Sequence, residues 1–255
     1  MSQADAGAGR PALRVVVVDD EPLARAVLGE LLADHEDVEI VAECGNGFEA
    51  VKAVAELAPD LLLLDIQMPK LDGFEVLDLV GQDVPVVFIT AYDEYAIKAF
   101  EVHAVDYLLK PFSAERLAEA LGRARERVAR GDRAPVAALW RTARPSSGPL
   151  ERVLIRDGAQ VHVVAAPDID FVEAQDDYAS FRARGRSYLK DQTLASIEAQ
   201  LDPGRFVRIH RSYILNVERL ARVELYAKDS RIAILKDGTK LPVSRAGYQR
   251  LKELL

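Results

Sequence analysis

Five residues in the first half of the chain combine the side-chain types that phosphoryl transfer uses: three carboxylates, a hydroxyl and an amino group. They are Asp19, Asp20, Asp65, Thr90 and Lys110. Grouped carboxylates repel one another unless a cation lies among them, and carboxylate oxygens suit Mg²⁺. Mg²⁺ and an ammonium group together stabilise the charge on phosphoryl oxygens, which leaves one carboxylate free to act as the nucleophile and form an acyl phosphate.

Each of these residues has an ordinary structural explanation when it is taken alone. An acid after a strand is usually a helix N-cap, a threonine often simply ends a strand, and a surface lysine is usually solvated. Their shared position favours chemistry, because each lies just past an apolar segment of the first half. Ligands of open α/β sheets bind beyond the carboxyl ends of the strands, so we expect the five side chains to meet at one sheet edge.

The apolar segments that must position these residues alternate with helical patterns, which predicts a five-stranded, doubly wound parallel sheet with helices on both faces. Strands are expected at Leu13–Val18, Val38–Ala42, Leu61–Leu64, Val86–Ile89 and Val105–Leu109. Helices are expected over Pro22–Leu32, Phe48–Leu57, Val76–Val80, Tyr95–Phe100 and Ala114–Val128.

The second half changes character and predicts a mainly antiparallel β domain. Strand-like segments are Val153–Arg156, Val161–Val164, Ile169–Glu173, Tyr178–Arg182, Phe206–Arg208, Ser212–Leu215, Val223–Tyr226, Arg231–Leu235 and Lys240–Val243. The dipeptides Asp157-Gly158 and Asp237-Gly238 indicate hairpin turns. Only Thr193–Leu201 and Arg245–Leu254 have helical patterns.

Composition shifts mark the predicted domain limits. We expect a disordered tail over residues 1–12, a first domain over 13–130, a linker over 131–149 and a second domain over 150–255. The linker is rich in proline, glycine and serine, and its segment Val136–Trp140 is a candidate docking segment.

Charge is unevenly divided between the halves. Residues 14–128 hold 10 basic and 24 acidic residues, whereas residues 150–255 hold 18 basic and 15 acidic residues. This asymmetry suggests different partners for the two domains. The single cysteine, Cys44, excludes a disulfide framework, and no apolar run approaches the length of a membrane helix. We therefore expect a cytoplasmic protein without a membrane partner.

The first half resembles the receiver domain of two-component response regulators, which has a flavodoxin-like fold. The matching strings are Val15-Val16-Val17-Val18-Asp19-Asp20-Glu21, Leu63-Leu64-Asp65-Ile66-Gln67-Met68-Pro69 with Asp72-Gly73, Phe88-Ile89-Thr90-Ala91, and Asp106-Tyr107-Leu108-Leu109-Lys110-Pro111-Phe112. No position of the signature is missing over residues 13–128. The resemblance therefore covers the whole of the predicted first domain.

The receiver resemblance gives the site residues specific roles. It implies that Asp65 is the phosphoacceptor, that Lys110 pairs with the phosphoryl group before a cis Pro111, and that Thr90 and Tyr107 form the switch pair. It also implies that Mg²⁺ is bound by Asp20, Asp65 and the carbonyl of Gln67, with help from Asp19. A sensor histidine kinase is the implied phosphodonor, and a homodimer is implied when Asp65 is phosphorylated.

The second half resembles the LytTR DNA-binding domain. The matching strings are Ile169-Asp170-Phe171-Val172-Glu173-Ala174, Thr193-Leu194-Ala195-Ser196-Ile197-Glu198, the run from Phe206 to Asn216, and Leu241-Pro242-Val243-Ser244-Arg245. In this family, loops between strands enter successive major grooves of double-stranded DNA.

The LytTR resemblance implies Arg211 and Arg245 as the main base or phosphate contacts, because a guanidinium group can bind guanine edges or phosphate oxygens through two hydrogen bonds. The loop Gln175–Tyr178 is a third candidate, although its two acids oppose binding to a DNA backbone. Lys240 and His210 are further candidates for DNA binding, and a structural role is the alternative for His210.

Together the two resemblances predict a phosphorylation-dependent transcriptional response regulator. Such a protein is not an enzyme beyond phosphorylation and dephosphorylation of its own aspartate. The main rival is a phosphohydrolase that uses the same carboxylates, Mg²⁺, lysine and threonine on small substrates. The second half also leaves open an RNA-binding or protein-interaction module.

Overall fold

The computed structural model describes residues 11–81, 84–92, 104–131, 149–176, 178–227 and 230–255. The chain divides into two compact units, the first mainly within residues 1–144 and the second mainly within 145–255. The predicted helix Tyr95–Phe100 and nearly all of the predicted linker lie outside the described residues. The domain limits therefore stay predictions.

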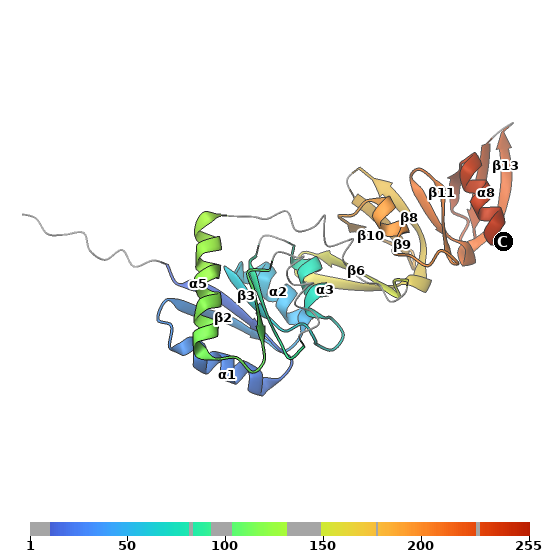
Figure 1. The fold of residues 1–255 in the computed structure, drawn as a ribbon. Helices are drawn as coiled ribbons and strands as arrows, with labels where there is room; N and C mark the ends of the chain where they lie inside the picture. The colour runs from blue at the N-terminus through green and yellow to red at the C-terminus, as the bar shows by residue number, and fades with distance from the viewer. Residues whose placement is uncertain (1–10, 82–83, 93–103, 132–148, 177, 228–229) are drawn as a thin grey trace, which may run out of the picture. The chain divides into compact units, whose positions relative to one another are not determined.

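The first unit contains a five-stranded parallel sheet in the order β2-β1-β3-β4-β5 (Figure 1). Its strands are β1 (Leu13–Val18), β2 (Val38–Cys44), β3 (Leu61–Leu64), β4 (Val86–Thr90) and β5 (Asp106–Leu109). Its described helices are α1 (Pro22–Ala33), α2 (Gly47–Leu57), α3 (Gly73–Val80) and α5 (Ala114–Arg130). The predicted doubly wound parallel sheet is confirmed.

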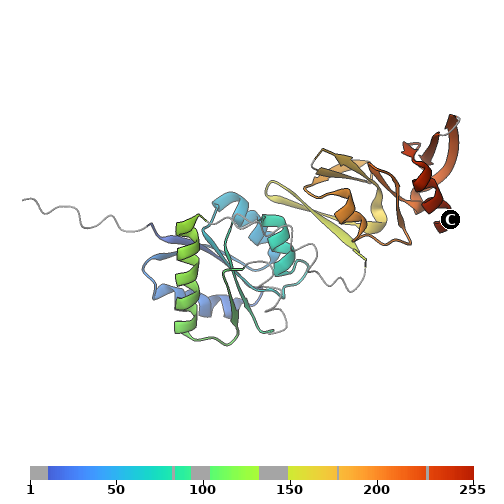
Figure 2. The same ribbon diagram turned by 45° about the horizontal axis from the view of Figure 1, so that its top comes forward.

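Helices cover both faces of this sheet, which explains why its strands are continuous apolar runs rather than alternating ones. On one face, Leu28 of α1 and Leu121 of α5 pack with Val15 and Val17 of β1. The other face is covered by α2 and α3 (Figure 2). There, Phe74 of α3 contacts Phe88 of β4 with ring centroids 5.1 Å apart.

The second unit is built from antiparallel strands, as predicted. A five-stranded sheet has the order β10-β9-β8-β12-β11, a three-stranded sheet the order β13-β14-β15, and β6 pairs with β7. The strands are β6 (Arg152–Asp157), β7 (Gln160–Ala165), β8 (Ile169–Gln175), β9 (Tyr178–Ala183), β10 (Arg186–Lys190), β11 (Phe206–His210), β12 (Tyr213–Asn216), β13 (Leu220–Ala227), β14 (Ser230–Leu235) and β15 (Lys240–Val243). The helices are α7 (Leu194–Glu198) and α8 (Arg245–Leu254), with the short 3-10 turns η2 (Ala166–Asp168) and η3 (Val217–Arg219).

Both faces of the five-stranded sheet are buried under other elements of the unit. Val172 and Ile214 point into a core that includes residues of α7, β6 and β7. Phe171 and Leu215, their neighbours along the same strands, point into a second core under β14, β15 and α8. This alternation on β8 and β12 fixes the register, because a slip by one residue would exchange the two faces.

The predicted elements differ from the observed ones at a few places. Strand β10 has no counterpart among the predicted strands, and the predicted helix Thr193–Leu201 is reduced to α7. The Lys110-Pro111 peptide bond is cis, as the receiver resemblance implies. Within the described residues, no helix is both long enough and apolar enough to cross a membrane.

Candidate functional site

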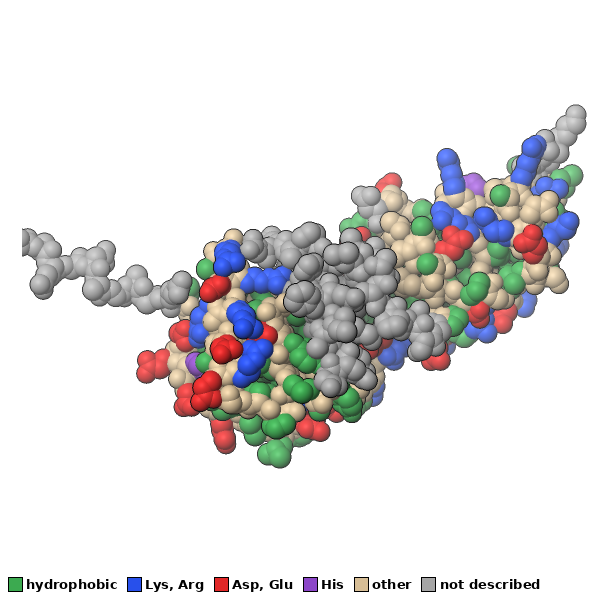
Figure 3. Space-filling model, viewed as in Figure 1, with side chains coloured by type: hydrophobic (Ala, Val, Ile, Leu, Met, Phe, Trp, Pro, Cys, Tyr) green, Lys and Arg blue, Asp and Glu red, His purple; other side chains and the backbone are tan. Residues whose placement is uncertain are grey.

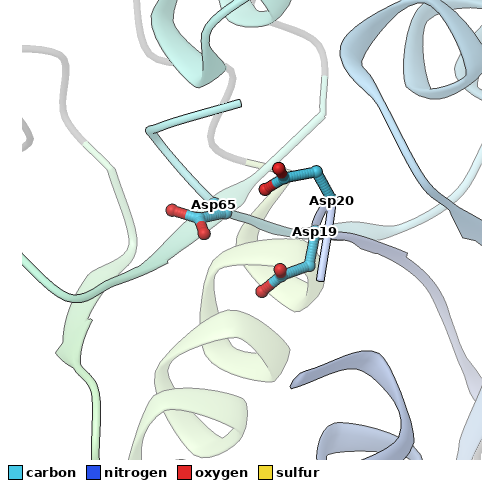
Figure 4. A group of neighbouring side chains, drawn as sticks. All are labelled: Asp19, Asp20 and Asp65. Atoms are coloured by element: carbon cyan, nitrogen blue, oxygen red, sulfur yellow. The ribbon is translucent and has the colours of Figure 1, made fainter. Parts of the chain in front are cut away.

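The three predicted carboxylates meet at the carboxyl edge of the parallel sheet. Strands β1 and β3 are neighbours with Val18 opposite Leu64, so the residues that follow them lie side by side. One carboxylate oxygen each of Asp19, Asp20 and Asp65 lies within 4.8 Å of the others (Figure 4). Asp19 and Asp65 are buried, whereas Asp20 is half-buried.

Lys110 brings a positive charge into this cluster from the end of β5. Its Nζ lies 2.5 Å from Oδ2 of Asp19 and 3.0 Å from Oδ2 of Asp65. Burial alone would lower the pKa of the Lys110 ammonium, but its bonds to the two carboxylates raise that pKa. Burial raises the pKa of the Asp65 carboxyl and the charge of Asp19 adds to this, while Lys110 opposes both effects.

Thr90 ends β4 at the same edge and is fully buried. Its Oγ1 has no hydrogen-bond partner among the described residues, which is uncommon for a buried hydroxyl. Its carbonyl accepts a bond of 2.8 Å from the Lys110 N–H, so Thr90 and Lys110 are held on adjacent strands. The hydroxyl is therefore available to donate to a group that enters the edge.

The loop after β3 holds Asp65 in place by close backbone contacts. The N–H of Gln67 donates to Oδ1 of Asp65 at 3.2 Å, and the N–H of Gly73 donates to the Ile66 carbonyl at 2.8 Å. A Cβ atom at Gly73 would lie 2.4 Å from the Asp65 carbonyl oxygen, so only glycine fits. The loop and α3 thus fix the Asp65 backbone.

Tyr107, the predicted switch aromatic, is half-buried on β5 and donates its hydroxyl to the Tyr92 carbonyl. Two side chains that were not predicted from the sequence, those of Asp106 and Arg116, hold the Tyr107 backbone. Oδ1 of Asp106 accepts from the Tyr107 N–H at 2.8 Å, and Arg116 of α5 donates to the Tyr107 carbonyl at 3.1 Å.

Asp106 is also the centre of an ion-pair cluster, in which the carboxylate is buried and its arginine partners are partly exposed. Arg116 donates two bonds of 2.6 and 2.8 Å to its carboxylate, and Arg123 donates one of 2.6 Å. Although burial raises the pKa of the Asp106 carboxyl, these bonds outweigh it and lower that pKa. The spacing of Arg116 and Arg123 on one helix face was visible in the sequence, but their partner was not.

The donor set of the acidic cluster fits a divalent cation. Three carboxylates and the Lys110 ammonium leave an excess of about two negative charges within a few ångströms. Carboxylate oxygens are the ligands that Mg²⁺ prefers, and Mg²⁺ usually keeps several waters, which the half-buried Asp20 would allow.

Three loops converge at one end of the five-stranded sheet in the second unit. The β8–β9 turn and the β11–β12 turn are adjacent, because the N–H of Ala174 donates to the Ser212 carbonyl at 2.9 Å. The junction of β15 and α8 joins them through a bond of 2.9 Å from the Ser244 N–H to the Ile209 carbonyl. Figure 3 shows Lys and Arg side chains gathered on the upper part of this unit.

The structure brings the two main predicted DNA contacts to this end. Arg211 lies in the β11–β12 turn and Arg245 at the start of α8, and both are exposed. His210 is half-buried and its Nδ1 accepts from the Ser212 N–H at 3.2 Å, so it supports the turn. Lys240 is exposed but begins β15, at the opposite end of that strand from Arg245.

Comparisons with known proteins agree with both resemblances. Residues 15–122 match the response regulator receiver domain, and residues 159–255 match the LytTr DNA-binding domain. A response regulatory protein of Vibrio cholerae is 40% identical over 248 residues, which cover 91% of this chain and 94% of that protein. The transcriptional regulatory protein BtsR of Escherichia coli and the sensory transduction protein LytT of Bacillus subtilis are each 35% identical over 246 residues, covering 95% of this chain and 99% of those proteins.

The chain therefore belongs to the response regulators that join a receiver domain to a LytTR DNA-binding domain. These relatives are regulators rather than enzymes, and receiver membership implies phosphorylation by a kinase.

Proposed function

We propose that this chain is a transcription regulator that a sensor histidine kinase activates by phosphorylating Asp65. The observation that carries the proposal is the meeting of Asp19, Asp20, Asp65 and Lys110 at one sheet edge, in a chain whose second half matches a DNA-binding family.

In the transfer step, a carboxylate oxygen of Asp65 attacks phosphorus, an acyl phosphate bond forms, and the bond to the donor's leaving group breaks. The Lys110 ammonium, 3.0 Å from Asp65, compensates the negative charge that arrives. The Thr90 hydroxyl, which has no partner among the residues that the structure describes, then donates to a phosphoryl oxygen. Asp19, Asp20, Asp65 and the Gln67 carbonyl would hold Mg²⁺, which would supply further charge neutralisation.

Phosphorylation adds roughly 1.5 to 2 negative charges, which biases the domain toward a second packed state. Movement of Thr90 toward the phosphoryl group leaves space for Tyr107 to reorient. Since Arg116 of α5 bonds both the Tyr107 carbonyl and the Asp106 carboxylate, this change reaches α5 and the face around it. We propose that this face forms the homodimer of the phosphorylated protein.

A dimer holds two LytTR domains, and two linked modules bind a repeated DNA element far more tightly than one. We propose that Arg211 and Arg245 contact bases or phosphates of double-stranded DNA, with His210 and Lys240 as further candidates. Because phosphate contacts release counterions, binding should weaken steeply as salt rises. Binding to chromosomal DNA places the protein in the cytoplasm.

The decisive experiment labels the full chain with radioactive acetyl phosphate and Mg²⁺. We expect Asp65→Asn to take up no label and Asp34→Asn, which alters an exposed carboxylate at the end of α1, to label like the wild type. Persistent label on Asp65→Asn would refute the assignment of the phosphoacceptor.

The same experiment separates a regulator from a phosphohydrolase. A regulator takes up about one phosphoryl group per chain and then slowly loses it by hydrolysis at Asp65, whereas a phosphohydrolase turns over a small phosphate ester many times. DNA capture with and without phosphorylation follows, and weaker capture by Arg211→Ala and Arg245→Ala is expected. Preference for RNA over duplex DNA in competition would contradict the proposal for the second domain.

A further inference from the structure

Arg208 of β11 lies in the run from Phe206 to Asn216 that resembles the LytTR DNA-binding domain, yet its guanidinium group is directed at the protein. Nη1 lies 3.1 Å from Oε2 of Glu198 in α7, and Nη2 donates to the Arg211 carbonyl at 2.8 Å. Its side chain is only 25% exposed. Both terminal nitrogens of Arg208 thus bond protein groups rather than pointing into solvent.

The Arg211 carbonyl is one of three backbone groups by which the β11–β12 turn is fixed. His210 accepts from the Ser212 N–H at 3.2 Å, and the Ser212 carbonyl accepts from the Ala174 N–H at 2.9 Å. With the bond from Arg208, the turn is held by two residues of β11, Arg208 and His210, and by Ala174 of β8. The Arg211 side chain remains exposed on this fixed backbone.

The backbone of Arg208 and Ile209 also fixes α8, which begins with Arg245. Arg250 donates from Nε and Nη2 to the Arg208 carbonyl at 3.1 and 2.6 Å. The Ile209 carbonyl accepts from both the N–H and the Oγ of Ser244, at 2.9 and 3.0 Å. Arg208 therefore takes part in hydrogen bonds that hold both the turn with Arg211 and the helix that begins at Arg245.

We propose that Arg208 is a positioning residue for DNA recognition, which holds the Arg211 turn in its base-reading geometry without touching DNA, and that Glu198 fixes Arg208 for this task. The inference rests on the proposed function of the second domain. Phosphate contacts govern non-specific binding, whereas base contacts govern sequence preference. A residue that only positions Arg211 should therefore affect sequence preference and leave non-specific binding unchanged.

The test compares variants of the full chain, activated with beryllofluoride and Mg²⁺, on two probes. One probe is a duplex selected by the wild-type protein from a random-sequence library, and the other is the same duplex with its sequence scrambled. Arg208→Met and Arg208→Lys should both bind the selected duplex about tenfold more weakly, the loss expected when one base contact is misplaced. Binding to the scrambled duplex should stay within about twofold of the wild type.

Lysine is the informative replacement, since it keeps the charge but cannot reach two divergent acceptors through a planar fork. A direct phosphate contact would instead be retained by lysine, and Arg208→Met would weaken both probes equally. That result overturns the inference, and so does wild-type binding by both variants.

Glu198→Gln removes a negative charge, whereas Arg208→Met removes a positive one, so their direct electrostatic effects on DNA binding are opposite. The Glu198 variant also keeps the test valid if an Arg208 variant does not fold. Removal of an acid near DNA should strengthen binding to the scrambled duplex, if it has any effect. The positioning role predicts that the same change weakens binding to the selected duplex several-fold, and an equal gain on both probes contradicts it. Arg211→Ala serves as the separate control: if it binds both probes like the wild type, the proposed DNA contact fails rather than the role of Arg208.

Discussion

Replacement of Asp106 by asparagine should destabilise the first unit by about 2–3 kcal/mol at neutral pH. The carboxylate accepts three bonds from Arg116 and Arg123 and one from the Tyr107 N–H, and its side chain is only 8% exposed. A hydrogen bond to a charged group contributes about 1.5–3 kcal/mol. The sum is reduced because Arg116 is 33% and Arg123 is 53% exposed, so solvent screens part of each interaction.

The pH dependence of this loss has a defined sign. The pKa of the Asp106 carboxyl is lower in the folded protein than its ordinary value of 3.8, so its contribution to stability is complete above that value and is lost as the pH falls through the folded pKa. The difference in unfolding free energy between the wild type and Asp106→Asn should therefore be constant from about pH 8 to about pH 5. It should narrow only below about pH 4.

The assay is urea unfolding of the full chain, read by hydrogen exchange in the peptides of β5 and α5. Asp37→Asn is the matched control: Asp37 also lies 2.6 Å from an arginine of α5, Arg125, but its side chain is 54% exposed. That pair should contribute less than about 1 kcal/mol. An equal loss for both variants, or a loss for Asp106→Asn that grows as the pH falls toward 4, would refute the assignment of the effect to ion pairs of the Asp106 carboxylate.

Two further outcomes follow from contacts in the second unit. In thermal unfolding, Gly247→Ala should destabilise that unit by about 2 kcal/mol or more, because the new Cβ would lie 1.9 Å from the Ile209 carbonyl oxygen. Gly122→Ala in α5 of the first unit is the control. No atom lies within 4 Å of the added Cβ there, so the stability of α5 should be unchanged or higher. In an ultraviolet titration, the phenol of Tyr213 should ionise near pH 12 rather than 10, because its 2.6 Å bond to Glu173 raises its pKa to about 12. A difference spectrum against Tyr213→Phe that develops near pH 10 would show that this bond is absent in solution.

The sequence predicted the acidic edge well because parallel strands place the residues after them at one edge regardless of loop detail. The run Leu61–Leu64 has the predicted bounds in the structure, and Asp65 follows it beside Asp19. The cluster around Asp106 was not predictable in the same way. It depends on how α5 is rotated over β5, and the pattern of apolar residues fixes that rotation only approximately.

In the second half, one strand was missed because its residues give no apolar pattern. Strand β10, Arg186–Lys190, lies at the edge of its sheet and offers mostly polar or exposed side chains, so it carries no alternating apolar signal. The proposed positioning role of Arg208 could not be predicted from the sequence either. The sequence shows that an arginine is present, but not that its guanidinium group bonds Glu198 instead of facing solvent.

The β11–β12 turn at the end of the five-stranded sheet lies outside both hydrophobic cores of the second unit, which separates what the turn contacts from what stabilises the fold. Arg211 is an exposed turn residue, so under the proposed function its replacement would alter DNA recognition while changing the stability of the domain little. Replacement of a buried strand residue such as Ile209 or Leu215 would instead leave a cavity in the core, so the scaffold tolerates change in its turns far better than in its strands.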